Sequence, residues 1–270
     1  MGAEPSLIAA QLQSAIVGAT GLESLVSCSF GLFQSLLWFV TFWLDSNLLI
    51  QMVTNLNSAA DKLIIAPHVS PPLEVDNLDS SVWDDVEPIR ITHYWSGHEA
   101  PEQKYAEAQV CWSEESLHVR FVCNQQEALI VNSTPVTNKK TLGLWERDVC
   151  EIFVAPDPTN PNRYFEFEAA PTGEWVDLGI LITSSGKETD WDFQSGMSVA
   201  ALVQRGRVTI GMKIPWSEKI PKPQHAEEWR VNLFRCVGPE LEQRYLAWQP
   251  TETAQPNFHV PEAFGWLRFA

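Results

Sequence analysis

The sequence predicts an all-β fold, an antiparallel sandwich or barrel that begins near Lys62. Short segments that alternate apolar and polar residues recur at regular spacing, and turn-forming residues separate them. No long helical periodicity follows residue 62. Together these observations favour strands throughout the C-terminal three-quarters of the chain.

The first part of this region contains one clear hairpin. The segments 106–112 (AEAQVCW) and 117–123 (LHVRFVC) flank four polar residues, Ser113 to Ser116. A polar loop is expected at 124–143, and the strand RDVCEIFV follows at 147–154.

The second part continues the pattern. The segment PDPTNPN at 156–162 is typical of a turn, because Pro and Asn fill most of it. A second hairpin is centred on Gly206 and joins the segments 198–204 and 208–214. The remaining strands are expected at 163–170, 174–182, 228–237, 244–248 and 265–270.

Residues 1–61 differ from the domain expected at 62–270 because they contain no Lys or Arg. The stretch from Leu25 to Leu44 carries no charge over about 20 residues, enough for a helix to cross a bilayer. No basic region precedes it, so an ordinary signal peptide is not favoured. Three interpretations stay open: a membrane-anchoring helix, a helix packed on the domain or on a partner, and an upstream stretch absent from the mature protein. A membrane-anchored or extracytoplasmic location is favoured, and a cytoplasmic one stays open.

The composition argues against some partners and motifs. The formal net charge is −16 at pH 7 and no basic stripe occurs, so a nucleic acid is not expected as a partner. A neutral ligand rich in hydroxyl groups meets no such repulsion. The five cysteines form no CxxC pair, and those within strand-like segments are expected to be small buried side chains. These are Cys111, Cys123, Cys150 and Cys236.

Strand alternation places aromatic and acidic residues on one face. Glu151 lies on one face of its strand, and Trp145 shares that face if the strand extends back to Leu144. Glu166 and Glu168 share a face of the following strand. The opposite, core-facing sets are Cys150, Ile152 and Val154, and Phe165, Phe167 and Ala169. Because sugars stack their C–H faces on aromatic rings and donate hydroxyl hydrogens to carboxylates, this face is a candidate carbohydrate site.

Each of these residues also has a plainer interpretation. A Glu on the outer face of a strand is usually solvated, and a Trp that begins a strand is more often packed than ligand-binding. Two neighbouring acids also raise the question of glycoside hydrolysis. However, two acids on the same side of a substrate cannot easily flank the glycosidic bond that would be cleaved. Asp76, Asp79, Asp84 and Asp85 form an acidic cluster, with Asp76 and Asp79 as candidate calcium ligands. A solvated, turn-forming segment is favoured there.

Several segments, taken in order, resemble carbohydrate-binding module family 9 and its family 9-like relatives. They are PPLEVDNLDSSVWDD (71–85), AQVCWSEESLHVRFVC (108–123), LWERDVCEIFV (144–154), YFEFEAAPTGEWVD (164–177), and YLAWQPT (245–251) with NFHVPEAFGWLRF (257–269). The resemblance covers about residues 62 to 270 and implies a jelly-roll-like β-sandwich, often joined to glycoside hydrolases and so linked to carbohydrate catabolism. Such modules bind the ends of glycan chains between two aromatic rings.

The same resemblance implies roles for single residues. By motif position, Trp145 would be one ring and Glu151 a polar contact, and Phe258 takes the place of the second ring, a Trp in xylanase-attached members. Glu166 and Glu168 stand where those members have Arg and Asn, so the xylanase-type sugar specificity is not carried over.

The leading hypothesis is a non-catalytic carbohydrate-binding domain. The alternatives are a sandwich for another ligand, such as a redox cofactor, a hydrolase accessory with weak activity, and a structural or partner-binding domain. Haem attachment would require axial His or Met ligands aimed into one pocket.

Overall fold

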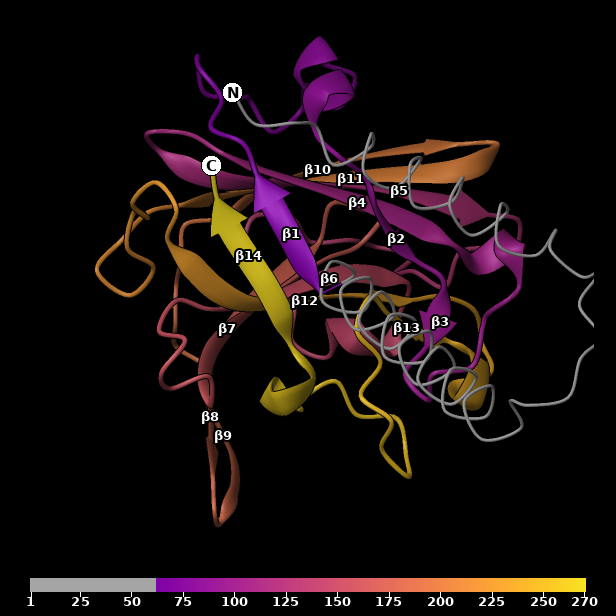
Figure 1. Ribbon diagram of the computed structural model, residues 1–270. Coiled ribbons are helices and arrows are strands. Elements are labelled where there is room, and N and C mark those ends of the chain that lie inside the picture. Colours follow the sequence, from indigo (N-terminus) through magenta and orange to yellow (C-terminus); the bar gives the residue numbers. More distant parts are fainter. Residues whose placement is uncertain (1–61) are drawn as a thin grey trace, which may run out of the picture. The chain divides into compact units, whose positions relative to one another are not determined.

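The computed structural model describes residues 62–270 (Figure 1). The hydrophobic segment from Leu25 to Leu44, its expected helical state and its membrane role lie outside the described residues. Within the described part of the chain, no helix is long and apolar enough to cross a bilayer. The domain boundary at residue 62 stays a prediction.

Two β-sheets make up the domain, as expected for an all-β fold (Figure 1). The larger sheet has the order β1-β14-β12-β6-β7-β8-β9, with β13 paired to β12 and β3 paired to β13. Its strands are β1 (Leu63–Ala66), β3 (His93–Tyr94), β6 (Val149–Ala155), β7 (Arg163–Ala169), β8 (Trp175–Thr183), β9 (Gly186–Asp190), β12 (Glu228–Cys236), β13 (Tyr245–Ala247) and β14 (Gly265–Phe269).

The smaller sheet has the order β10-β11-β5-β4-β2. Its strands are β2 (Ile89–Ile91), β4 (Ala106–Trp112), β5 (Ser116–Gln125), β10 (Ser198–Gln204) and β11 (Gly206–Pro215). Both predicted hairpins are present: β4 pairs with β5 across the Ser113 turn, and β10 pairs with β11 beside Gly206. Gly206 has a φ of +77°, a value that suits glycine in a tight turn.

The strand pairs are antiparallel with one exception, which corrects the expectation of a purely antiparallel fold. β1 runs parallel to β14, with Leu63 opposite Trp266. The finer expectation of a jelly-roll-like strand order stays a prediction. Short 3-10 helices fill several connections: η1 (Ser81–Asp85), η2 (Glu102–Lys104), η3 (Leu144–Glu146), η4 (Leu241–Gln243) and η5 (Pro261–Ala263).

One continuous cluster of buried apolar side chains joins the two sheets. The smaller sheet contributes Val119 and Phe121, and the larger contributes Ile152 and Phe167, all of them fully buried. The predicted core-facing sets therefore do face the interior, because alternate residues of a strand point to the same side. The four predicted cysteines are also buried.

The larger sheet is buried on its other face as well around β6 and β7. Every residue of β6 is buried, and so is every residue of β7 after Arg163. The ring of His259, in the connection between β13 and β14, stacks on Phe153 at 5.4 Å between centroids. This connection thus covers a face that strand alternation alone assigns to solvent.

Candidate functional site

A cavity of about 240 Å³ lies between this covered face and the segments around it. All five residues singled out from the sequence line it: Trp145, Glu151, Glu166, Glu168 and Phe258. The structure therefore brings together residues that are up to 113 positions apart in the chain.

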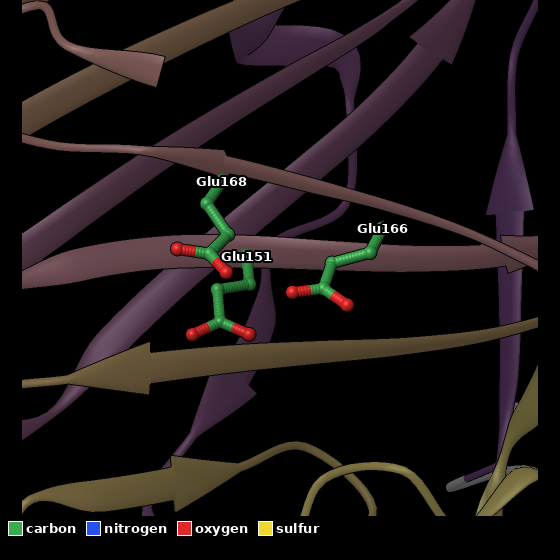
Figure 2. Close-up of side chains that lie close together, drawn as sticks. All are labelled: Glu151, Glu166 and Glu168. Atoms are coloured by element: carbon green, nitrogen blue, oxygen red, sulfur yellow. The ribbon is translucent and has the colours of Figure 1, made fainter. Parts of the chain in front are cut away.

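The three glutamates reach the cavity from two neighbouring strands. Glu151 of β6 pairs directly with Glu168 of β7, and Glu166 follows two residues earlier on the same face. Figure 2 shows their carboxyl groups directed toward one another. One oxygen from each carboxyl group lies within 4.8 Å of an oxygen from each of the others.

These carboxyl groups are buried, which argues against the plainer interpretation that Glu166 and Glu168 are only solvated. Glu151, Glu166 and Glu168 are each between 0 and 3% exposed. Glu151 accepts a hydrogen bond from Cys236 Sγ at 3.3 Å. Glu166 Oε2 and both carboxyl oxygens of Glu168 have no hydrogen-bond partner among the described residues outside the triad.

Burial raises the pKa of all three carboxyl groups, so each of them keeps its proton to a higher pH than an exposed glutamate does. Burial, with the charge of Glu166 as a second cause, raises the pKa of Glu151 to about 8. Burial also raises the pKa of Glu166, and it raises the pKa of Glu168 well above its usual range together with the two neighbouring carboxylates. A carboxyl group that retains its proton can donate one hydrogen bond as well as accept others.

A hydrogen-bonded chain closes one side of the cavity. Lys187 of β9 donates from Nζ to His259 Nε2 at 2.7 Å, and His259 Nδ1 lies 2.8 Å from the hydroxyl group of Tyr164. Burial, and then the charge of Lys187, lowers the pKa of His259 to about 3, so the ring is neutral. With Nε2 accepting from Lys187, the neutral ring carries its hydrogen on Nδ1 and donates it to Tyr164.

The aromatic side of the cavity differs from the sequence-based expectation. Trp145 lies in the short helix η3 and not in a strand, so the argument from strand phase does not place it. Its indole contacts Trp191, with ring centroids 6.4 Å apart and planes inclined by 39°. Trp191 is 48% exposed, and sequence reasoning missed it.

Phe258 lines the cavity but is also part of the packed interior. It stacks on Phe234 with centroids 4.0 Å apart and an interplanar angle of 16°. Tyr245 meets its edge at 5.6 Å. One face of the Phe258 ring is thus occupied by protein, and its residue is only 9% exposed.

The acidic cluster considered as a weak calcium candidate lies on the surface, in keeping with the favoured interpretation as a solvated, turn-forming segment. Asp76 and Asp79 are exposed, as are Asp84 and Asp85. Among residues 62–270, the one group of three or more acidic, His or Cys side chains whose ligand atoms converge is the glutamate triad of the cavity. If a metal ion is held by such a group, the triad is the place for it.

A family model described as carbohydrate family 9 binding domain-like matches residues 75–270 of this chain. The chain belongs to this family. The resemblance drawn from its sequence motifs is therefore confirmed. The sequence matches none of the curated proteins with which it was compared.

Solved structures share the fold of this family 9-like domain. A candidate carbohydrate-binding protein from Bacteroides uniformis ATCC 8492 has 17% identity and a TM-score of 0.60, over 77% of this chain and 99% of that one. A carbohydrate-binding module of family 9 from Caldicellulosiruptor kristjanssonii, in complex with glucose, has 16% identity and a TM-score of 0.55, over 77% and 96%. A family 9 carbohydrate-binding module from the same organism, in complex with cellotriose, has 17% identity and a TM-score of 0.51. The match covers 77% of this chain and 93% of that one.

Proposed function

We propose that this protein binds a carbohydrate without transforming it, and that the ligand occupies the cavity above the glutamate triad. The observation that carries the proposal is the meeting of aromatic rings with carboxyl groups in one cavity. Sugar rings present C–H faces that pack on aromatic rings, and their hydroxyl groups both donate and accept hydrogen bonds. The cavity offers Trp145 and Trp191 for the first purpose, and the triad for the second.

The size of the cavity favours a single sugar residue or the end of a chain. Ligand pockets commonly measure about 300–1,000 Å³, and this one lies just below that range. The family 9 modules solved with glucose and with cellotriose support a carbohydrate as the ligand class. A role alongside carbohydrate catabolism rests on the family resemblance.

The arrangement of the acids supports binding over hydrolysis. Glycosidases place two carboxyl groups on either side of the scissile bond, about 5–5.5 Å apart in retaining enzymes and 6.5–9.5 Å apart in inverting ones. Here Glu151 and Glu168 are cross-strand neighbours on one sheet face, and Glu166 lies on the same face. A substrate above that face meets all three acids from one side.

A redox cofactor is less well supported. His259 is the one His or Met among the residues that line the cavity. Its two ring nitrogens are already engaged with Lys187 and Tyr164. No imidazole nitrogen therefore faces this cavity free to bind a haem iron.

The test is a titration of the full chain with glucose and cellotriose by calorimetry, with a glycan array to widen the search. Loss of one aromatic contact, by Trp145→Ala or Trp191→Ala, should weaken binding about tenfold or more, since stacking on a ring contributes roughly 1–3 kcal/mol in nucleobase complexes. Trp266→Ala is the matched control, because Trp266 is also partly buried but does not line the cavity.

Two results would contradict the proposal. One is the absence of binding to any sugar on the array by a folded wild-type chain. The other is unchanged affinity in Trp145→Ala and Trp191→Ala, which would place the sugar elsewhere. A large drop in melting temperature for Trp145→Ala would show that this ring mainly serves packing.

A further inference from the structure

The glutamate triad is a cluster of oxygen ligands that forms no ion pair with a Lys or Arg among the described residues, although Lys187 and Arg244 act on Glu151 from a distance. The one basic side chain of residues 62–270 within 4 Å of a triad oxygen is His259, whose Nδ1 lies 3.9 Å from Glu166 Oε2. Its ring is neutral, and Nδ1 donates its hydrogen to Tyr164. Lys187 directs its Nζ to His259. A buried carboxylate without a partner is energetically costly, so the ionised triad requires a positive charge inside the cavity.

The spacing of the oxygens matches the coordination shell of a hard divalent cation. Calcium binds oxygen ligands at about 2.3–2.6 Å, so oxygens on opposite sides of the ion are about 4.6–5.2 Å apart. The three glutamate oxygens lie within 4.8 Å of one another and fit inside such a shell. Magnesium binds at about 2.0–2.1 Å and demands a tighter octahedron.

We propose that Glu151, Glu166 and Glu168 form a divalent-cation site with a preference for calcium at the floor of the cavity. Two observations support it: the convergence of three ligand oxygens, and the buried oxygens of Glu166 and Glu168, which have no partner among the described residues outside the triad. Three monodentate glutamates supply about half of the six to eight oxygens that calcium takes. Water or ligand oxygen atoms from the open side of the cavity complete the shell. This site goes beyond sugar binding and does not depend on it.

The experiment is a calorimetric titration of the chelator-treated full chain with CaCl₂ and, separately, MgCl₂, with no sugar present. We expect one saturable calcium site and weaker magnesium binding.

Variants locate the site. Glu168→Gln keeps the side-chain shape but removes a charged ligand, and it should weaken calcium binding by about tenfold or more, since even outer-shell changes cost 10–100-fold at metal sites. The matched control is the double variant Asp76→Asn/Asp79→Asn, which removes the acids of the other candidate site and should leave calcium affinity unchanged. Circular dichroism checks that each variant is folded, and Glu166→Gln replaces Glu168→Gln if the latter is not.

The proposal is overturned if the folded wild-type chain binds no calcium. It is equally overturned if calcium affinity survives in Glu168→Gln and Glu166→Gln, or if it is lost in the Asp76→Asn/Asp79→Asn variant. Because no sugar enters these titrations, their failure leaves the proposed carbohydrate binding untouched, and failure of the sugar titrations leaves the cation site untouched.

Discussion

Replacing Glu151 by Gln should change how the stability of the domain depends on pH. In the unfolded chain this carboxyl group titrates near its ordinary pKa of 4.5, and in the folded domain burial and Glu166 raise the pKa to about 8. Between these two pH values the folded state keeps a proton that the unfolded state has lost. Stability therefore falls as pH rises through this window, and the contribution is fully present only below pH 4.5.

The size of the effect follows from the difference in pKa. A difference of 3.5 pKa units, at 1.36 kcal/mol each, corresponds to about 5 kcal/mol lost between pH 4.5 and pH 8. This is an upper limit, because water entry or local rearrangement relieves part of the cost of a buried charge. The raised pKa values of Glu166 and Glu168 act in the same direction.

The assay is urea unfolding of the wild type and Glu151→Gln at several pH values from 5 to 8, in the presence of a chelator. Glutamine keeps the size of the side chain and can still accept from Cys236, but it does not ionise. We expect the two proteins to differ little at pH 5 and the variant to lose less stability toward pH 8. Glu107→Gln, at an exposed position of β4, serves as the control and should follow the wild type. Wild-type stability that increases steadily from pH 5 to pH 8, or a variant with the wild-type slope, would refute the reasoning.

Three further predictions follow from the fold and the cavity. Residues 62–270 expressed alone should unfold cooperatively as a β protein, as judged by circular dichroism and urea unfolding, and an aggregated or molten product would contradict the domain boundary. The full chain should not hydrolyse aryl glycosides; turnover that disappears in Glu166→Gln or Glu168→Gln would overturn its assignment as a binding protein. Phe258→Ala should destabilise the domain by about 3–5 kcal/mol in chemical unfolding, because Phe258 is 9% exposed and stacked on Phe234. A loss of less than 1 kcal/mol would show instead that this ring is free for a ligand.

The strands that build the walls of the cavity could be predicted from the sequence. Alternation around Glu151 and around Glu166 and Glu168 is regular, since one side of each strand packs on the apolar interior between the sheets. The same alternation correctly groups the three acids on one face.

Their burial could not be predicted in this way. The segment that covers them, around His259, is about 90 residues farther along the chain than Glu166, and alternation carries no information about contacts at that distance. Alternation therefore gives no sign that this polar face is covered. The clue present in the sequence is local: Phe153 and Tyr164 lie on the same face, and their large rings require a cover.

Two contributors from β9 and its flank were missed for a different reason. The strand Gly186–Asp190 is polar and mostly exposed, so it shows no alternation. Among the strands of residues 62–270 it pairs only with β8, and this pairing brings Lys187 and the following Trp191 to the cavity. Trp145 lines the cavity beside Glu151, but strand alternation does not explain this position. The short helix η3 contains Trp145, and β6 begins only at Val149.

The position of β9 at the edge of the larger sheet has a consequence for how this domain diverges. One wall of the cavity is carried by a hairpin that projects from the body of the domain, and its outer strand contributes little to the interior (Figure 1). Insertions, deletions and substitutions there carry a small stability cost compared with changes in β6 or β7. Related domains can therefore acquire new ligand preferences by altering the length and composition of this hairpin, while the acid-bearing strands remain constrained by the core they share.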